Sequence, residues 1–248
     1  MLKLPWDTAN YRPITARNLY TIYYGWLIAD PEGTPNQEAR AIAAARPELL
    51  IAFFYTFEPK YTNLSEQVRK LMADAGVRLF AYVDTDYGRR DLEAVRAEVN
   101  EYLAQDVAGI FFDQVYNFLD DSRLSYYQEI SSMVRSHTKA FIFNTGIAQP
   151  GEEIMNVTDI MMVEHDWRKL YQANSWFAKY PPERFMGNSS NEHPGLYFDQ
   201  PINAEIAVRD TLEAWANGVG WHFSTDRYVS LPTWFSEYAA NLREGQPK

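Results

Sequence analysis

Eight short apolar runs, each ending in polar residues, constrain the fold of this chain more than any other feature. They begin near residues 18, 48, 77, 108, 139, 159, 183 and 219. Longer segments with helical periodicity separate them, which is the pattern of βα units around a parallel sheet. Several runs are hydrophobic almost throughout, as expected of strands buried on both faces. For a chain of 248 residues, the pattern predicts an α/β fold, a (β/α)8 TIM barrel, as a single domain over residues 1–248.

The segments between the runs predict amphipathic helices. Apolar residues recur every three or four positions in 64–75 and in 92–103. Asn63 and Glu66 have the spacing of a capping box at the start of the first of these helices, and Gly76 stands where its C-terminal cap belongs. The run at 183–190 is the least regular of the eight. The segment after it, 191–201, contains Pro and Gly, so this part of the chain has an alternative interpretation as an irregular lid.

The charge of the chain disfavours two classes of partner. There are 33 acidic and 23 basic residues, for a net charge of −10, which repels phosphate backbones and anionic lipid. No apolar stretch approaches a membrane span, and residues 1–13 lack the apolar core of a signal peptide. We therefore expect no nucleic-acid or membrane partners. For the oligomeric state, the expectation is a monomer. It would be cytoplasmic as it stands, or secreted if a leader precedes this sequence.

Several kinds of chemistry lack their usual sequence signatures. The chain has no cysteine, which excludes thiolate metal sites and a cysteine nucleophile. The four histidines show no metal-ligand spacing, and the motifs G-x-S-x-G, the Walker loop and G-x-G-x-x-G are all missing. We therefore predict no metal site and no organic cofactor.

Two carboxylates stand at the ends of predicted strands. Period-two alternation places Gly109, Phe111 and Asp113 on one face of the fourth strand, with Asp113 last. Similarly, Met162 and Glu164 share a face of the sixth strand. The carboxyl ends of barrel strands meet at one rim, where barrel enzymes keep their active sites. A pair of carboxylates at that rim is what glycosidic cleavage requires, although a strand-end Asp can also serve only to cap a helix.

Other strand ends supply further polar or aromatic candidates. These are Asp84, Asn144, His165, Trp221 and Asp226. Aromatic residues form 15% of the chain, and flat rings with polar edges suit sugar-binding clefts as well as large cores. Each of these five residues has a structural alternative as an ordinary group of the rim.

The ordered strand ends resemble those of a known family. The segments are AYVDTDYGRR from Ala81, GIFFDQV from Gly109, FNTG from Phe143, TDIMMVEHD from Thr158 and FSTD from Phe223. Together they resemble the spherulation-specific (spherulin-type) glycoside hydrolases, barrel enzymes that act on galactosaminogalactan-like polysaccharides. The resemblance runs from about Tyr20 to Asp226. Related barrels that cleave α-1,4-linked galactosamine share the same plan.

The resemblance implies roles for individual residues. It makes Asp113 and Glu164 the two catalytic carboxylates. It places Tyr82, Tyr87 and Arg90 on a segment that lines the sugar-binding cleft.

Asn144 matches the Asn of a segment that the family usually writes N-P-G, which is Asn-Thr-Gly here. Two features depart from the family. Gln114 replaces a Glu beside Asp113, and the loop from Phe57 lacks an Asn- and Gly-rich sequence. Gln114 is therefore included among the candidate substrate-binding residues.

The leading hypothesis is endo-cleavage of an α-linked galactosamine or N-acetylgalactosamine polysaccharide or oligosaccharide. Asp113 is assigned as nucleophile and Glu164 as acid/base. Carboxylate oxygens about 5 Å apart would indicate retention, and about 6.5–9.5 Å inversion.

Two alternatives stay open at this point. One is a barrel that binds carbohydrate without cleaving it, which Gln114 favours. The other is a different barrel enzyme, such as a deacetylase or isomerase, for which the strand ends would need metal ligands or a lysine base. Arg90 and Asp226 also have an alternative as a structural ion pair.

Overall fold

The computed structural model describes residues 15–53, 62–147, 149–164, 167–173, 175–190 and 201–244. Eight parallel strands close into a barrel in which each strand pairs with its neighbours in chain order and β8 pairs with β1. They are β1 (Asn18–Tyr23), β2 (Leu49–Ala52), β3 (Arg78–Asp84), β4 (Gly109–Asp113), β5 (Ala140–Asn144), β6 (Ile160–Met162), β7 (Phe185–Ser190) and β8 (Trp221–Thr225). The predicted (β/α)8 fold is confirmed. All eight predicted strands are present, including the irregular seventh.

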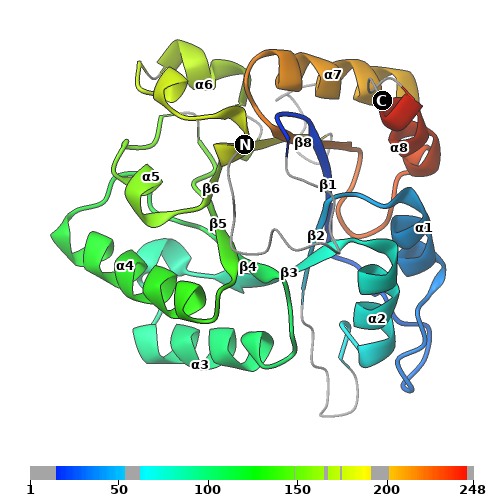
Figure 1. The fold of residues 1–248 in the computed structure, drawn as a ribbon, viewed down its shortest axis with the longest axis horizontal. Coiled ribbons are helices and arrows are strands. Elements are labelled where there is room, and N and C mark those ends of the chain that lie inside the picture. Colours follow the sequence, from blue (N-terminus) through cyan, green and yellow to red (C-terminus); the bar gives the residue numbers. More distant parts are fainter. Residues whose placement is uncertain are drawn as a thin grey trace.

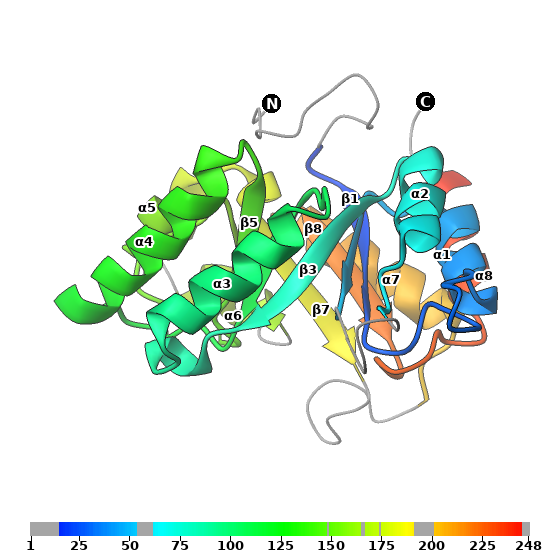
Figure 2. The ribbon, with the colours of Figure 1, turned by 90° about the horizontal axis from the view of Figure 1, so that it is seen from below.

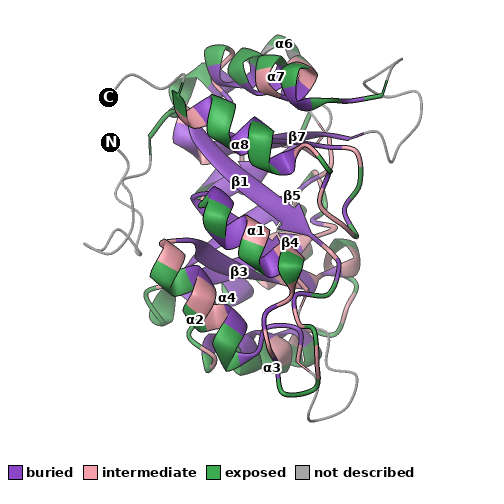
Figure 3. Cartoon of the chain, turned by 90° about the vertical axis from the view of Figure 1, so that its right-hand side faces the viewer, coloured by how far each residue is buried: buried purple, intermediate pink, exposed green. Residues whose placement is uncertain are grey.

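Helices surround the barrel (Figure 1). They are α1 (Gln37–Ala45), α2 (Glu66–Ala75), α3 (Leu92–Leu103), α4 (Asp121–Ser136), α5 (Ile154–Val157), α6 (Trp167–Ala173), α7 (Ala204–Ala216) and α8 (Phe235–Glu244). In side view the strands run through the middle with helices on either side (Figure 2). The strands are buried along most of their length, whereas the helices expose their outer faces (Figure 3). The core therefore lies inside the barrel and between the barrel and its helices.

The start of α2 differs from the sequence prediction. Its N-cap is Ser65, whose side chain accepts a hydrogen bond from the Val68 backbone N–H. The Asn63 side chain instead accepts from the backbone of Leu27 and donates to the carbonyl of Gly25. The predicted capping box is therefore wrong, because a buried Asn that satisfies backbone groups of a neighbouring loop is not free to cap a helix. The predicted C-cap at Gly76 is confirmed, with a φ of 74°.

The alternation predicted for β4 is confirmed. The Phe111 ring lies 5.8 Å from the ring of Tyr82 inside the barrel, whereas Phe112 packs against Phe143 on the outer side. Gly109 faces inward, where an added Cβ would lie 2.3 Å from the carbonyl oxygen of Ala140. This register directs the last residue of the strand, Asp113, toward the barrel mouth.

The sixth strand is shorter than predicted. It ends at Met162, and the next residue donates its backbone N–H to the carbonyl of Met186 in β7. Glu164 follows with a φ of 46°, in the left-handed region. A turn beyond the strand, rather than the strand's own alternation, therefore sets the direction of the Glu164 side chain.

Candidate active site

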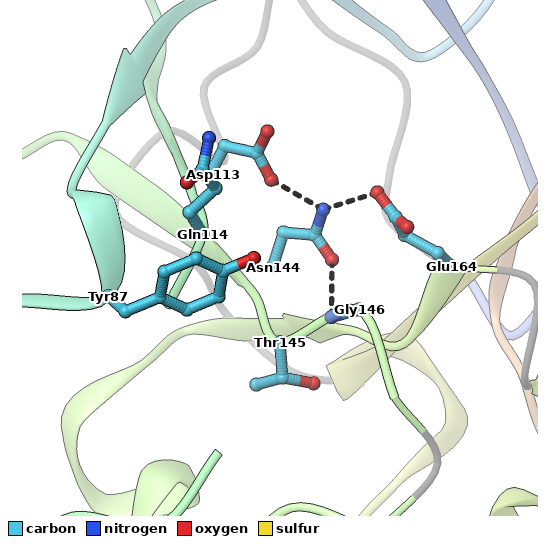
Figure 4. Close-up of a pocket in the computed structure, with 7 residues that line it drawn as sticks. All are labelled: Tyr87, Asp113, Gln114, Asn144, Thr145, Gly146 and Glu164. Carbon is cyan, nitrogen blue, oxygen red and sulfur yellow. Dashed lines mark hydrogen bonds between the residues drawn. The ribbon is translucent and has the colours of Figure 1, made fainter. Parts of the chain in front are cut away.

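A cavity of about 300 Å³ opens at the end of the barrel where the strands finish. Tyr87, Asp113, Gln114, Asn144, Thr145, Gly146 and Glu164 line it (Figure 4). These residues come from the carboxyl ends of β4 and β5, from the turn after β6, and from the loop between β3 and α3. The structure thus brings both predicted carboxylates to one cavity, together with three of the other predicted residues.

Asn144 joins the two carboxylates. Its Nδ2 donates to Asp113 Oδ1 at 2.7 Å and to Glu164 Oε1 at 2.6 Å (Figure 4). Its Oδ1 accepts from the backbone N–H of Gly146 at 3.0 Å. Since only the oxygen can accept that N–H, the amide nitrogen must face the carboxylates. The two carboxylate oxygens therefore lie no more than about 5.3 Å apart, the combined length of the two bonds.

The second oxygen of Asp113 is also held. Tyr82 Oη donates to Asp113 Oδ2 at 2.6 Å. Burial and the negative charge of Asp113 raise the pKa of Tyr82, so its phenol keeps the proton that it donates. Asp113 is therefore oriented through both oxygens, by an amide and by a phenol.

Glu164 differs in its proton affinity. Burial, followed by the charge of Asp113, raises its pKa from 4.5 to about 7, and the hydrogen bond from Asn144 lowers it in part. A carboxyl group with such a pKa still carries its proton in much of the population near neutral pH. The pair therefore combines one carboxylate held by two donors with one proton-bearing carboxyl group, which is the division of roles that acid/base chemistry needs.

Several residues at the rim of this cavity have left-handed backbone conformations. Among the described non-glycine residues with positive φ, four lie at the rim: Asp86 (45°), Tyr87 (56°), Gln114 (52°) and Glu164 (46°). Each such residue costs about 1 kcal/mol or more, and such residues persist where the surrounding structure holds them in place. Residues held in this conformation are frequent at functional sites, so the four at the rim are consistent with a site built around the two carboxylates.

Gln114 contacts Asp84 rather than Asp113 in the contacts described. Its Nε2 donates to Asp84 Oδ2 at 3.3 Å, and its backbone carbonyl accepts from the N–H of Tyr87 at 2.7 Å. The other oxygen of Asp84 accepts from the Asp86 backbone N–H at 2.7 Å. Gln114 and Asp84 therefore link the ends of β3 and β4 at the edge of the cavity.

Replacing Gln114 by Glu is expected to destabilise this chain at neutral pH. It would set two carboxylates against each other near the rim, at a cost of about 2 kcal/mol. The cost should disappear as the pH falls toward 4 and one carboxylate is protonated. Urea denaturation of Gln114→Glu at both pH values measures it. The double variant Gln114→Glu/Asp84→Asn is the control and should recover most of the loss, and an equal loss in the double variant would contradict the pairing.

Two predicted site residues, Arg90 and Asp226, are not among the residues that line the cavity. The Arg90 guanidinium pairs with the Glu98 carboxylate at 2.5 Å and donates to the Asp84 carbonyl, so it braces the β3–α3 connection. Asp226 pairs with its neighbour Arg227 at 3.0 Å. The suggested ion pair between Arg90 and Asp226 is therefore wrong, because each side chain has a nearer partner.

Trp221 is also not a rim residue. It begins β8, is fully buried, and donates its indole N–H to the Glu183 carbonyl. It thus lies at the amino end of the barrel. The apolar run begins at Val219, but β8 begins only at Trp221, so this residue is the first of its strand rather than one near its end. His165 lies outside the described residues, as do segment 191–200 and most of the loop from Phe57.

Thr145 and Gly146 line the cavity without having been predicted. Thr145 Oγ1 donates to the Met162 carbonyl at 3.1 Å, which joins the end of β5 to β6. Gly146 has a φ of 68°. The sequence feature that could have indicated both residues is their position directly after Asn144, where a strand ends.

Two further classes of feature were sought in the described parts of the chain. No cluster of three or more His, Cys, Asp or Glu suited to a metal ion occurs there. Likewise, none of the described helices combines the length and the apolar character that crossing a bilayer requires.

Comparison with known proteins places the chain in a family. Residues 56–243 match Spherulin4, described as spherulation-specific family 4. The chain belongs to this family. The match begins after β2, so it covers less of the N-terminal part than the resemblance from Tyr20 predicted, and it extends further at the C-terminal end. No curated protein matches.

Solved structures share the barrel of this spherulin-type chain. Aspergillus clavatus Sph3, in complex with GalNAc, is 16% identical with a TM-score of 0.68, over 91% of this chain and 97% of that one. The chitinase-like agglutinin of Robinia pseudoacacia is 12% identical with a TM-score of 0.54, over 90% and 99%. A chitinase of Chromobacterium violaceum is 8% identical with a TM-score of 0.54, over 92% and 100%. At these identities the likeness is one of fold.

Proposed function

We propose that this chain is a glycoside hydrolase that cleaves α-linked galactosamine or N-acetylgalactosamine within a polysaccharide. The observation that carries the proposal is the pair Asp113 and Glu164, which share one amide donor in a cavity at the carboxyl end of the barrel. Membership of the spherulin-type family supports the substrate class, as does the GalNAc bound to the structurally similar Sph3.

The two carboxyl groups have different roles in this proposal. Glu164, whose pKa is raised to about 7, donates its proton to the leaving glycosidic oxygen. Asp113, oriented by Tyr82 and Asn144, attacks the anomeric carbon from the opposite face and forms a glycosyl ester. Glu164 then removes a proton from water, which attacks the same carbon and releases Asp113.

The separation of the pair favours retention of configuration. The upper limit of about 5.3 Å between the bridged oxygens lies below the roughly 6.5–9.5 Å of inverting glycosidases, whose carboxyl groups must leave room for a water between them. The stereochemistry of the substrate is consistent with a protein nucleophile. In an α-linked 2-amino sugar the C2 nitrogen lies on the same face as the leaving group, so it cannot attack from the opposite face.

Product release from two polymers tests the proposal. Purified galactosaminogalactan and chemically deacetylated galactosaminan are incubated with the wild-type chain and with Asp113→Asn. We expect oligosaccharides from wild type and a loss of at least about a thousandfold in rate with Asp113→Asn. A preference for one polymer would define the acetylation state of the substrate. Absence of products from both polymers would overturn the proposed activity.

The second candidate is a barrel that binds carbohydrate without cleaving it. Gln114, in place of the family's Glu, is the observation that favours it, and a chitinase-like agglutinin with a similar fold gives it a parallel. Affinity electrophoresis in gels containing each polymer separates the two candidates. A binding protein would be retarded equally as wild type and as Asp113→Asn while releasing no product from either polymer.

A further inference from the structure

We propose that the loop between β4 and α4 carries a second sugar-binding subsite, formed by Tyr116 and Phe118. It would hold the polysaccharide beyond the sugar in the cavity. The inference rests on the proposed function and deepens it, because it concerns how the rest of the substrate chain is bound. Tyr116 is 37% and Phe118 57% exposed, although both are large aromatic residues.

The exposed apolar residues are concentrated at one end of the barrel. Among the described residues, the large exposed hydrophobic ones are Trp26, Tyr87, Tyr116, Phe118, Leu212 and Val229. All except Leu212, which is on α7, lie in loops that follow the strands. Single exposed apolar residues are normal and would be scattered over the surface. Five of the six instead lie at the end of the barrel where the cavity opens, and this placement favours a role in binding.

The loop that presents the two rings is held in place. The backbone N–H of Tyr116 donates to the Tyr127 hydroxyl at 3.1 Å, and the carbonyl of Asn117 accepts from Gly151 at 2.8 Å. The guanidinium of Arg123 lies 4.0 Å from the centre of the Tyr116 ring. The rings are therefore exposed on a fixed backbone, which lowers the entropy cost of binding a ligand against them.

The loop is continuous with the cavity. Gln114 lines the cavity two residues before Tyr116, and its carbonyl accepts from the backbone of Tyr87, which lines the same cavity (Figure 4). Tyr87 is itself 41% exposed. A glycan that leaves the cavity past Tyr87 and Gln114 would therefore reach the rings of the next loop.

The chemistry of the rings selects the occupant. Aromatic faces stack on the C–H faces of pyranose rings, and a neutral ring imposes no charge requirement on acetylated or free amino sugars. A protein partner in a stable interface needs about 800 Å² from each side, far more than two side chains supply. The structure thus favours a sugar chain over a docked protein.

The dependence of cleavage on chain length tests this subsite. We would measure kcat/KM for galactosaminan oligosaccharides of increasing length, up to the polymer, with wild type, Tyr116→Ala, Phe118→Ala and Phe118→Trp. Leu212→Ala is the control, since it removes an exposed apolar residue far from the loop. For each Ala variant we expect the ratio of kcat/KM for the polymer to that for the shortest cleaved oligosaccharide to fall about tenfold. Phe118→Trp, which keeps an aromatic ring at this position, should keep the wild-type ratio.

The outcomes separate this inference from the proposed function. If both Ala variants keep the wild-type ratio, as Leu212→Ala should, the subsite is overturned while the proposed hydrolase activity stands. If wild type cleaves neither the oligosaccharides nor the polymer, the proposed function fails, and mobility of the same variants in gels containing galactosaminan decides the inference. Equal retardation of wild type and both Ala variants in those gels would overturn it.

Discussion

Glu164→Gln is expected to lower kcat on the polymer by about a thousandfold, because the amide cannot donate a proton to the leaving oxygen. In wild type, kcat/KM should fall as the pH rises through about 7, since Glu164 loses the proton that it must donate. The residual activity of the variant should not show this fall at high pH, which is the alkaline limb of the pH profile. The measurement is a pH series of initial rates for both proteins. A variant that keeps the limb at pH 7 would contradict the assignment of Glu164 as the acid.

The same substitution should change the pH dependence of stability. The pKa of Glu164 is higher in the folded chain than in the unfolded one, so its contribution to stability is fully present below about 4.5 and is lost as the pH rises through about 7. Glu164→Gln removes this loss. Relative to wild type, it should gain up to about 3 kcal/mol between pH 4 and pH 9. Thermal unfolding at the two pH values measures the gain, and an unchanged difference would argue that Glu164 is solvated.

Asn144→Leu is expected to lower kcat/KM by about a hundredfold or more. Among the contacts described, Asn144 is the only residue that donates to both carboxylates, and leucine cannot replace either hydrogen bond. The substitution should also move the alkaline limb to higher pH. Hydrogen bonding from Asn144 lowers the pKa of Glu164, so its removal raises that pKa further. The shift distinguishes a positioning role from a general loss of structure.

A matched control for this variant is Asn100→Leu, on the exposed side of α3. It makes the same chemical change away from the cavity and should leave both the rate and the limb as in wild type. If Asn144→Leu lowers the rate without moving the alkaline limb, the hydrogen bond from Asn144 does not control the pKa of Glu164.

Much of the fold and the two central carboxylates could be predicted because they depend on local pattern. Strands buried on both faces have nearly continuous apolar runs, and period two fixed the direction of Asp113. Glu164 was predicted from the alternation of the sixth strand, but that strand ends two residues earlier. A left-handed turn after the strand directs its side chain inward instead. Its position after an apolar run was a sufficient signal even so.

The remaining errors have separate causes. Asn63 has the spacing of a cap, yet it satisfies the backbone of the β1–α1 loop, which no local pattern reveals. Trp221 sits in an apolar run that extends beyond the start of its strand. Arg90 finds Glu98 on the following helix rather than Asp226. The bridging role of Asn144 also depends on three strands closing together, so the sequence indicated the residue but not its position between the carboxylates.

The most direct test of the account is the anomeric configuration of the first product. Wild-type enzyme and galactosaminan are mixed in an NMR tube, and the anomeric proton of the newly formed reducing end is followed before mutarotation. The account predicts that the α anomer appears first, because Asp113 and then water each invert the same carbon. A β anomer appearing first would show single inversion and contradict Asp113 as the nucleophile.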